Sequence, residues 1–86
     1  MIDRFDVGER INERRTRLGM TQKELAIKTD TTKSTVQKWE SGMHLPKKET
    51  IPKIAKHLKY SEGYLLYGEW ETWLNRYFYK MEKKYL

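Results

Sequence analysis

Residues 21–42 of the chain read TQKELAIKTDTTKSTVQKWESG, and they contain its strongest local structural signals. Thr21 and Glu24 stand three residues apart just before an apolar pair, which is typical of a capping box at the start of a helix. Thr32 is a second good N-cap, and Gly42 is a stop where a left-handed conformation is easiest. The stretch therefore predicts two short helices joined by a tight turn.

The turn is marked by residues whose side chains compete for nearby backbone groups, namely Thr29, Asp30, Thr31 and Thr32. We expect the first helix to begin at residue 22 and the second to span residues 33–41. Val36 and Trp39 share one side of the second helix. That side is therefore expected to face the core.

Upstream of this pair, Val7, Ile11 and Leu18 fall on one helical face, and Gly19 follows as a stop. This pattern predicts a helix over residues 5–18.

Downstream, apolar residues at spacings of three and four predict a helix over residues 50–59, with Pro52 in its first turn. Ser61 and Gly68 delimit a shorter fifth helix. No strand pattern appears, so the fold is expected to be all-α, with five helices in residues 5–68.

The composition favours a polyanionic partner. The 86 residues include 18 Lys and Arg against 12 Asp and Glu, a formal charge of +6, which suits phosphate or an anionic membrane. Cysteine is absent, and His44 and His57 are the only imidazoles, so we expect no metal and no cofactor. Without a nucleophile or general-base motif, the chain is predicted not to be an enzyme, and a cytoplasmic location is the default.

The last segment, residues 69–86, has a different pattern. Large apolar residues recur at spacings of three and four: Trp70, Trp73, Leu74, Tyr77, Phe78, Met81 and Tyr85. This predicts an additional C-terminal amphipathic helix, which needs an apolar partner because an isolated helix of this length is marginal in water. It can pair with another copy, dock on its own domain or lie on a membrane surface. Three glutamates weaken the membrane alternative, so we expect dimerisation or docking.

Two short helices joined by a tight turn suit insertion into the major groove of DNA, which is about 12 Å wide and admits one helix. Three segments carry a family resemblance: RINERRTRLGMTQKELA (10–26), STVQKWESG (34–42) and SEGYLLYGE (61–69). With them, residues 8–68 resemble the helix-turn-helix domain shared by lambdoid phage repressors, Cro proteins and XRE-type regulators. The resemblance implies a lambda-repressor-like fold and sequence-specific DNA binding.

The resemblance also implies roles for individual residues. The positions it places toward base edges, at the start and on the outer side of the second helix of the motif, are Thr32, Lys33, Ser34 and Lys38. The positions it places at DNA phosphates are Gln22, Met43, His44, Lys47 and Lys48. Gln22 would also brace the start of that second helix. An ion pair between Arg15 and Glu40 would hold the two ends of the motif together.

The chain departs from the family pattern at the turn, where Asp30 replaces the common glycine. Aspartate can adopt the left-handed conformation at some cost. Thr31 likewise replaces a buried aliphatic residue.

These observations predict a transcriptional regulator, a repressor that binds a palindromic operator as a homodimer. Residues 5–68 would bind double-stranded DNA, and residues 69–86 would dimerise or dock. The alternative is an antitoxin-like or adaptor module that grips a partner protein through the C-terminal aromatic residues.

Overall fold

The computed structural model describes residues 2–68, which form five α-helices. They are α1 (Arg4–Arg17), α2 (Gln22–Lys28), α3 (Lys33–Glu40), α4 (Ile51–Leu58) and α5 (Glu62–Tyr67). No strand occurs within this range, so the all-α prediction is confirmed. The aromatic stripe from Trp70 to Tyr85 lies outside the described residues.

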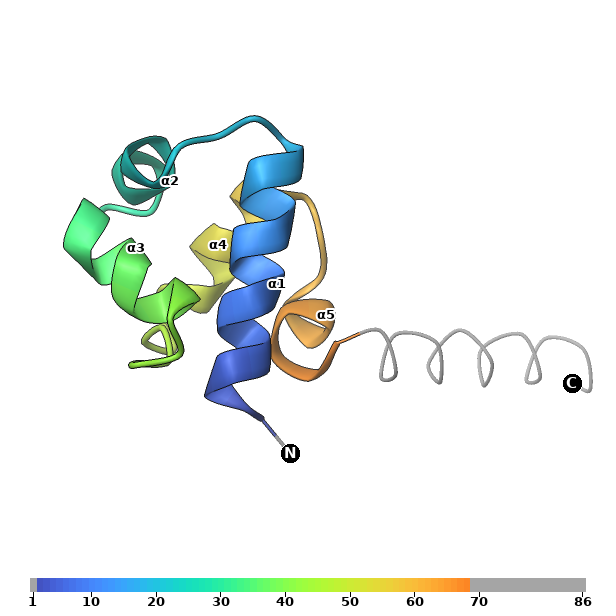
Figure 1. Ribbon diagram of the computed structural model, residues 1–86. Coiled ribbons are helices and arrows are strands. Elements are labelled where there is room, and N and C mark those ends of the chain that lie inside the picture. Colours follow the sequence, from blue (N-terminus) through green and yellow to red (C-terminus); the bar gives the residue numbers. More distant parts are fainter. Residues whose placement is uncertain (1, 69–86) are drawn as a thin grey trace, which may run out of the picture.

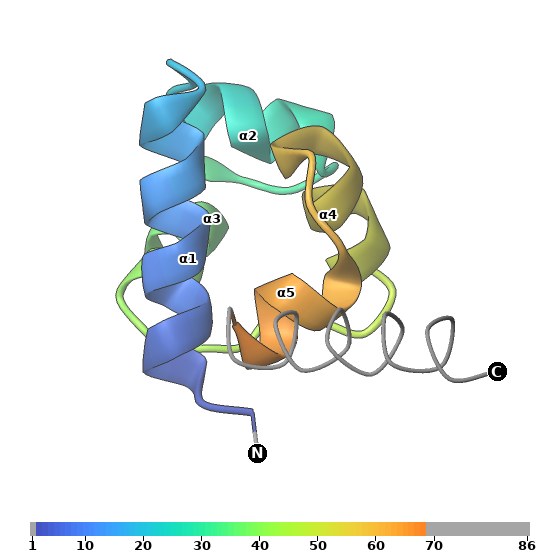
Figure 2. The same cartoon turned by 90° about the vertical axis from the view of Figure 1, so that its right-hand side faces the viewer.

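The helices surround a single apolar core. Figure 1 shows α2 and α3 beside each other on the side of α1 that faces away from α5, and Figure 2 shows α4 opposite α1. The core takes residues from every helix: Val7, Ile11, Leu25, Ala26, Val36, Trp39, Ile54, Leu58 and Leu65. Since α3 packs against both α1 and α2, its orientation is fixed by two neighbours.

The expected caps account for most of the helix boundaries. The Thr21 hydroxyl accepts a hydrogen bond from the Glu24 amide at 3.0 Å, and the Ser61 hydroxyl accepts one from the Tyr64 amide at 3.0 Å. Each bond satisfies an amide that the first turn leaves without a helical partner. α2 and α5 therefore begin where the sequence placed them. By contrast, α1, expected from residue 5, begins at Arg4 after the N-cap Asp3, and α4, expected from residue 50, begins at Ile51.

The end of α1 differs from the prediction. The helix stops at Arg17, with Leu18 as its C-cap, and Gly19 takes a positive φ of 71°. Leu18 is consequently turned off the buried face and is 38% exposed, whereas Val7 and Ile11 are buried. The helical periodicity that grouped these three residues fails once the chain leaves the helix.

A glycine in α1 permits its close packing on α3. A Cβ added to Gly8 would meet the backbone carbonyl oxygens of Trp39 and Glu40, the latter at 2.9 Å. The absence of a side chain therefore lets α1 approach the last turn of α3 closely.

Candidate nucleic-acid interface

The outer side of α3 is the candidate recognition surface. Val36 is fully buried and Trp39 is 4% exposed, so they hold the helix to the core. Lys33, Ser34 and Lys38 are all exposed. The helix thus presents hydrogen-bonding side chains to solvent from a rigid base, as a groove-reading helix must.

Thr32 sets the start of this helix. Its hydroxyl oxygen accepts a hydrogen bond from the Thr35 amide at 3.2 Å and lies 3.0 Å from the Thr35 hydroxyl. Thr32 is exposed, but its hydroxyl is occupied by these local contacts. Its structural role is therefore that of an N-cap.

Arg15 and Glu40, the pair expected from the family resemblance, form a two-pronged ion pair between α1 and α3. Arg15 donates through Nε to Glu40 Oε2 at 2.6 Å and through Nη2 to Oε1 at 2.9 Å. The two side chains are only 11% and 6% exposed. Because a buried charge without its partner is costly, the pair fixes how the two helices meet.

Two amides add to this pair. Asn12 donates to Glu40 Oε1 at 2.7 Å, and Gln22 donates to the same oxygen at 3.1 Å. Burial by itself would raise the pKa of Glu40, but the hydrogen bonds from Arg15, Asn12 and Gln22 outweigh it and hold the pKa below its usual range. Glu40 is therefore a carboxylate anion at neutral pH, and it accepts hydrogen bonds from three side chains of α1 and α2.

The bond from Gln22 differs from the expected one. Gln22 was expected to brace the start of α3. Its side-chain amide instead donates to Glu40, which is the last residue of that helix. One amide hydrogen of Gln22 remains for another acceptor, because the side-chain nitrogen carries two donors. Gln22 can thus contact a phosphate without releasing Glu40.

The loop after α3 supplies further polar side chains. Lys47 and Lys48 are exposed, and so is His44. The backbone amides of Met43 and His44 both donate to the Lys38 carbonyl, at 3.0 and 3.3 Å. Met43 therefore has no unused donor for a phosphate, since a thioether is only a weak acceptor.

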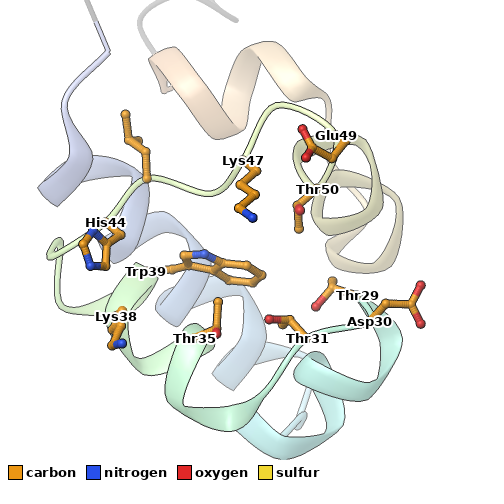
Figure 3. Close-up of a pocket in the computed structure, with 11 residues that line it drawn as sticks. Thr29, Asp30, Thr31, Thr35, Lys38, Trp39, His44, Lys47, Glu49 and Thr50 are labelled. Carbon is orange, nitrogen blue, oxygen red and sulfur yellow. The ribbon is translucent and has the colours of Figure 1, made fainter.

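A hollow of about 560 Å³ lies between α3, the turn before it and this loop. Trp39 forms its middle, with Lys38 and His44 at one end and Asp30 and Glu49 at the other (Figure 3). Lys47 reaches toward it from the loop. The cationic end of the hollow therefore adjoins the outer face of α3.

The turn before α3 takes the geometry that Asp30 was expected to tolerate. Asp30 has a positive φ of 57°, and its carboxylate accepts a hydrogen bond from Lys53 at 3.1 Å. Thr29 is buried, and its hydroxyl donates to the Leu25 carbonyl at 2.8 Å. Thr31 is half-buried. The turn is thus held without the usual glycine and aliphatic residue.

Sequence reasoning overlooked three residues near this surface. Asn12 contacts Glu40, Gln37 lies exposed on α3, and Lys23 lines a hollow beside Lys33. The spacing of three between Asn12 and Arg15 was a usable signal, because such residues share a helix face.

No group of metal-ligating side chains occurs within residues 2–68, and none of the described helices is long and apolar enough to cross a membrane.

Comparison with known proteins agrees with this geometry. A family model described as Helix-turn-helix matches residues 11–65. The P22 c2 repressor, solved in complex with synthetic operator 9T, is 32% identical with a TM-score of 0.72, over 73% of this chain and 96% of that chain. The restriction-modification controller protein C.AhdI from Aeromonas hydrophila is 30% identical with a TM-score of 0.68, over 74% and 93%.

A further match has a limited extent. CoII HppE, solved in complex with substrate, is 29% identical with a TM-score of 0.66, over 74% of this chain but only 36% of that chain. This likeness concerns the helix-turn-helix portion alone. A search of curated proteins finds no match.

Proposed function

Because the chain belongs to the XRE-type helix-turn-helix family, we propose that it is a sequence-specific DNA-binding transcriptional regulator and, more narrowly, a repressor. In this proposal α3 enters the major groove of its operator, and no enzymatic step is involved. The likeness to a repressor solved on its operator supports it.

The observation that carries the proposal is the two-sided character of α3. Val36 and Trp39 are buried, while Ser34 and Lys38 are exposed one helical turn apart on the opposite side. Residues spaced by four lie one above the other on a helix. A serine hydroxyl and a lysine ammonium in this arrangement can meet adjacent base edges, and lysine donates well to guanine O6 and N7.

The polar side chains of the loop after α3 are assigned to the DNA backbone. Lys47 and Lys48 follow α3 in the chain and are exposed, and His44 lies beside Lys38 at the rim of the hollow. Contacts of this kind add affinity and fix the register of the protein on DNA, but they carry no sequence information directly.

We assign DNA binding to residues 5–68 and dimerisation to residues 69–86, whose sequence carries the apolar stripe. A dimer with two-fold symmetry would place one α3 in each of two half-sites about 34 Å apart, which requires a palindromic operator.

The test begins with selection of bound duplexes from a random pool by the full chain, followed by binding titrations. A palindrome is expected, with half-site centres about one helical turn apart. Lys38→Ala is expected to cost about 1 to 3 kcal/mol on the selected operator and to relax preference at one position. Lys47→Ala is expected to weaken binding to all duplexes similarly. Recovery of no preferred sequence would overturn the proposed function.

Dimerisation is tested separately by light scattering on the eluted protein. The native chain is expected to have twice the monomer mass, and Leu74→Glu, within the apolar stripe, is expected to be monomeric. A native chain that remains monomeric on and off the operator would refute this part of the proposal.

A further inference from the structure

A second hollow lies on the other side of α3 from the Trp39 hollow. It has a volume of about 610 Å³ and runs between the loop after α1, the first turn of α2 and the start of α3. Its lining includes Arg15, Gln22, Lys23 and Lys33. We call it the α2–α3 notch.

Lys33 belongs to the notch because of its angular position on α3. Lys33 and Glu40 are seven residues apart, about two turns, so they lie on nearly the same side of the helix. Glu40 points toward α1 and accepts the hydrogen bond from Gln22. Ser34 and Lys38 lie on the side opposite Val36 instead. Lys33 therefore faces the notch, whereas Ser34 and Lys38 face outward from the domain.

The notch has an excess of positive charge. The guanidinium of Arg15 is neutralised by Glu40 at 2.6 Å. Lys23 and Lys33 are both exposed, and neither forms an ion pair or a side-chain hydrogen bond that involves residues 2–68. Two ammonium groups from different helices thus line one concave surface with no anion between them.

We propose that Lys23 and Lys33 hold a single phosphodiester of the DNA backbone between them, and that Lys33 does not read a base. Each ammonium carries three donors, and a phosphate offers acceptors to both at once. The inference rests on the proposed function, and it leaves Ser34 and Lys38 as the base-reading pair. It also replaces the expectation that Lys33, the first residue of α3, specifies sequence.

The experiment uses the full 86-residue chain, the selected operator and an unrelated duplex of equal length. Lys23→Ala, Lys33→Ala and the double variant are compared with Lys28→Ala. Lys28 is an exposed lysine of the same helix α2, at its opposite end and outside the notch, and serves as the matched control. Binding is titrated at several salt concentrations.

Lys23→Ala and Lys33→Ala are each expected to weaken both duplexes by the same factor. Because the two ammonium groups hold this phosphate jointly, loss of either one removes the contact. One lost phosphate contact reduces the magnitude of the negative slope of log K against log salt by about 0.9, so a fourfold rise in salt should shrink the deficit of each variant about 3.5-fold. Because the lysines share one phosphate, the double variant should lose less than the product of the single losses. Lys28→Ala should bind like the native chain.

Two results would overturn the inference while leaving the proposed function intact. One is a Lys33→Ala variant that relaxes preference at one operator position and hardly affects the unrelated duplex, which would make Lys33 a base-reading residue. The other is a Lys23→Ala variant with no greater loss than Lys28→Ala. Failure of the native chain to prefer the selected operator would instead reject the proposed function itself.

Discussion

Replacement of Gly8 by alanine tests the close packing that orients the recognition helix. The new methyl group would meet the carbonyl oxygens of Trp39 and Glu40, and these backbone atoms cannot rotate away as a side chain could. Either α1 or the last turn of α3 must then move. The same movement would disturb the Arg15–Glu40 ion pair, which links these two helices.

The size of the effect follows from two opposing contributions. Overpacking against rigid atoms costs about 3 kcal/mol, at the upper end of the usual range. Alanine is the better helix former by about 1 kcal/mol, which offsets part of this cost. The net loss of about 2 kcal/mol corresponds to a fall in Tm of about 8 to 16 °C for a domain of this size.

Thermal unfolding followed by circular dichroism measures this change, and Gly63→Ala is the matched control. Gly63 also lies within a helix, but the nearest atom to an added Cβ is the Ser61 hydroxyl oxygen at 3.8 Å. The control is therefore expected to unfold at the native temperature or a few degrees above it, because only the gain in helix propensity remains. A Gly8→Ala protein as stable as the Gly63→Ala protein would refute the close approach of α1 to α3.

Three further changes have defined outcomes. Glu40→Gln leaves the Arg15 guanidinium without its carboxylate and is expected to cost about 3 kcal/mol in urea unfolding. Because the pKa of Glu40 is lowered by folding, its stabilising effect is complete at neutral pH and is lost as the pH falls below about 4; this acid loss should be smaller in Glu40→Gln. Thr32→Ala removes the N-cap of α3 and is expected to cost about 1 kcal/mol in the same assay, whereas a loss below a few tenths would show that the cap is dispensable. Tyr60→Phe should be at least as stable as the native chain, because the buried Tyr60 hydroxyl has no hydrogen-bond partner within residues 2–68; a clear loss of stability would reveal a partner.

The helices could be predicted from the sequence because their starts depend on hydrogen bonds between residues close together in the chain. Thr21, Thr32 and Ser61 each cap a helix through a hydroxyl three residues before the amide it satisfies. Such contacts are short in sequence and recur in fixed patterns, so they can be recognised without a structure.

The contacts between helices could not be predicted in the same way. The need for glycine at position 8 arises only when α1 meets the carbonyl groups of α3, more than thirty residues later in the chain. The hydrogen bond from Gln22 to Glu40 is similar, because it joins side chains eighteen residues apart that meet only once α2 and α3 have packed together. Periodicity assigns a residue to a face, but it does not supply the angle at which two faces meet.

On α3, the residues that hold the helix against the domain are separate from the residues proposed to contact DNA. Val36, Trp39 and Glu40 are buried or paired on the inner side, so changes there should lower stability and DNA binding together. Ser34 and Lys38 are exposed, so changes there should alter binding at nearly constant stability. Substitutions at Ser34 and Lys38 can therefore change operator preference while the residues on the inner side of α3 continue to specify the same fold. A substitution at Lys38 that lowered Tm as much as one at Val36 would contradict this separation.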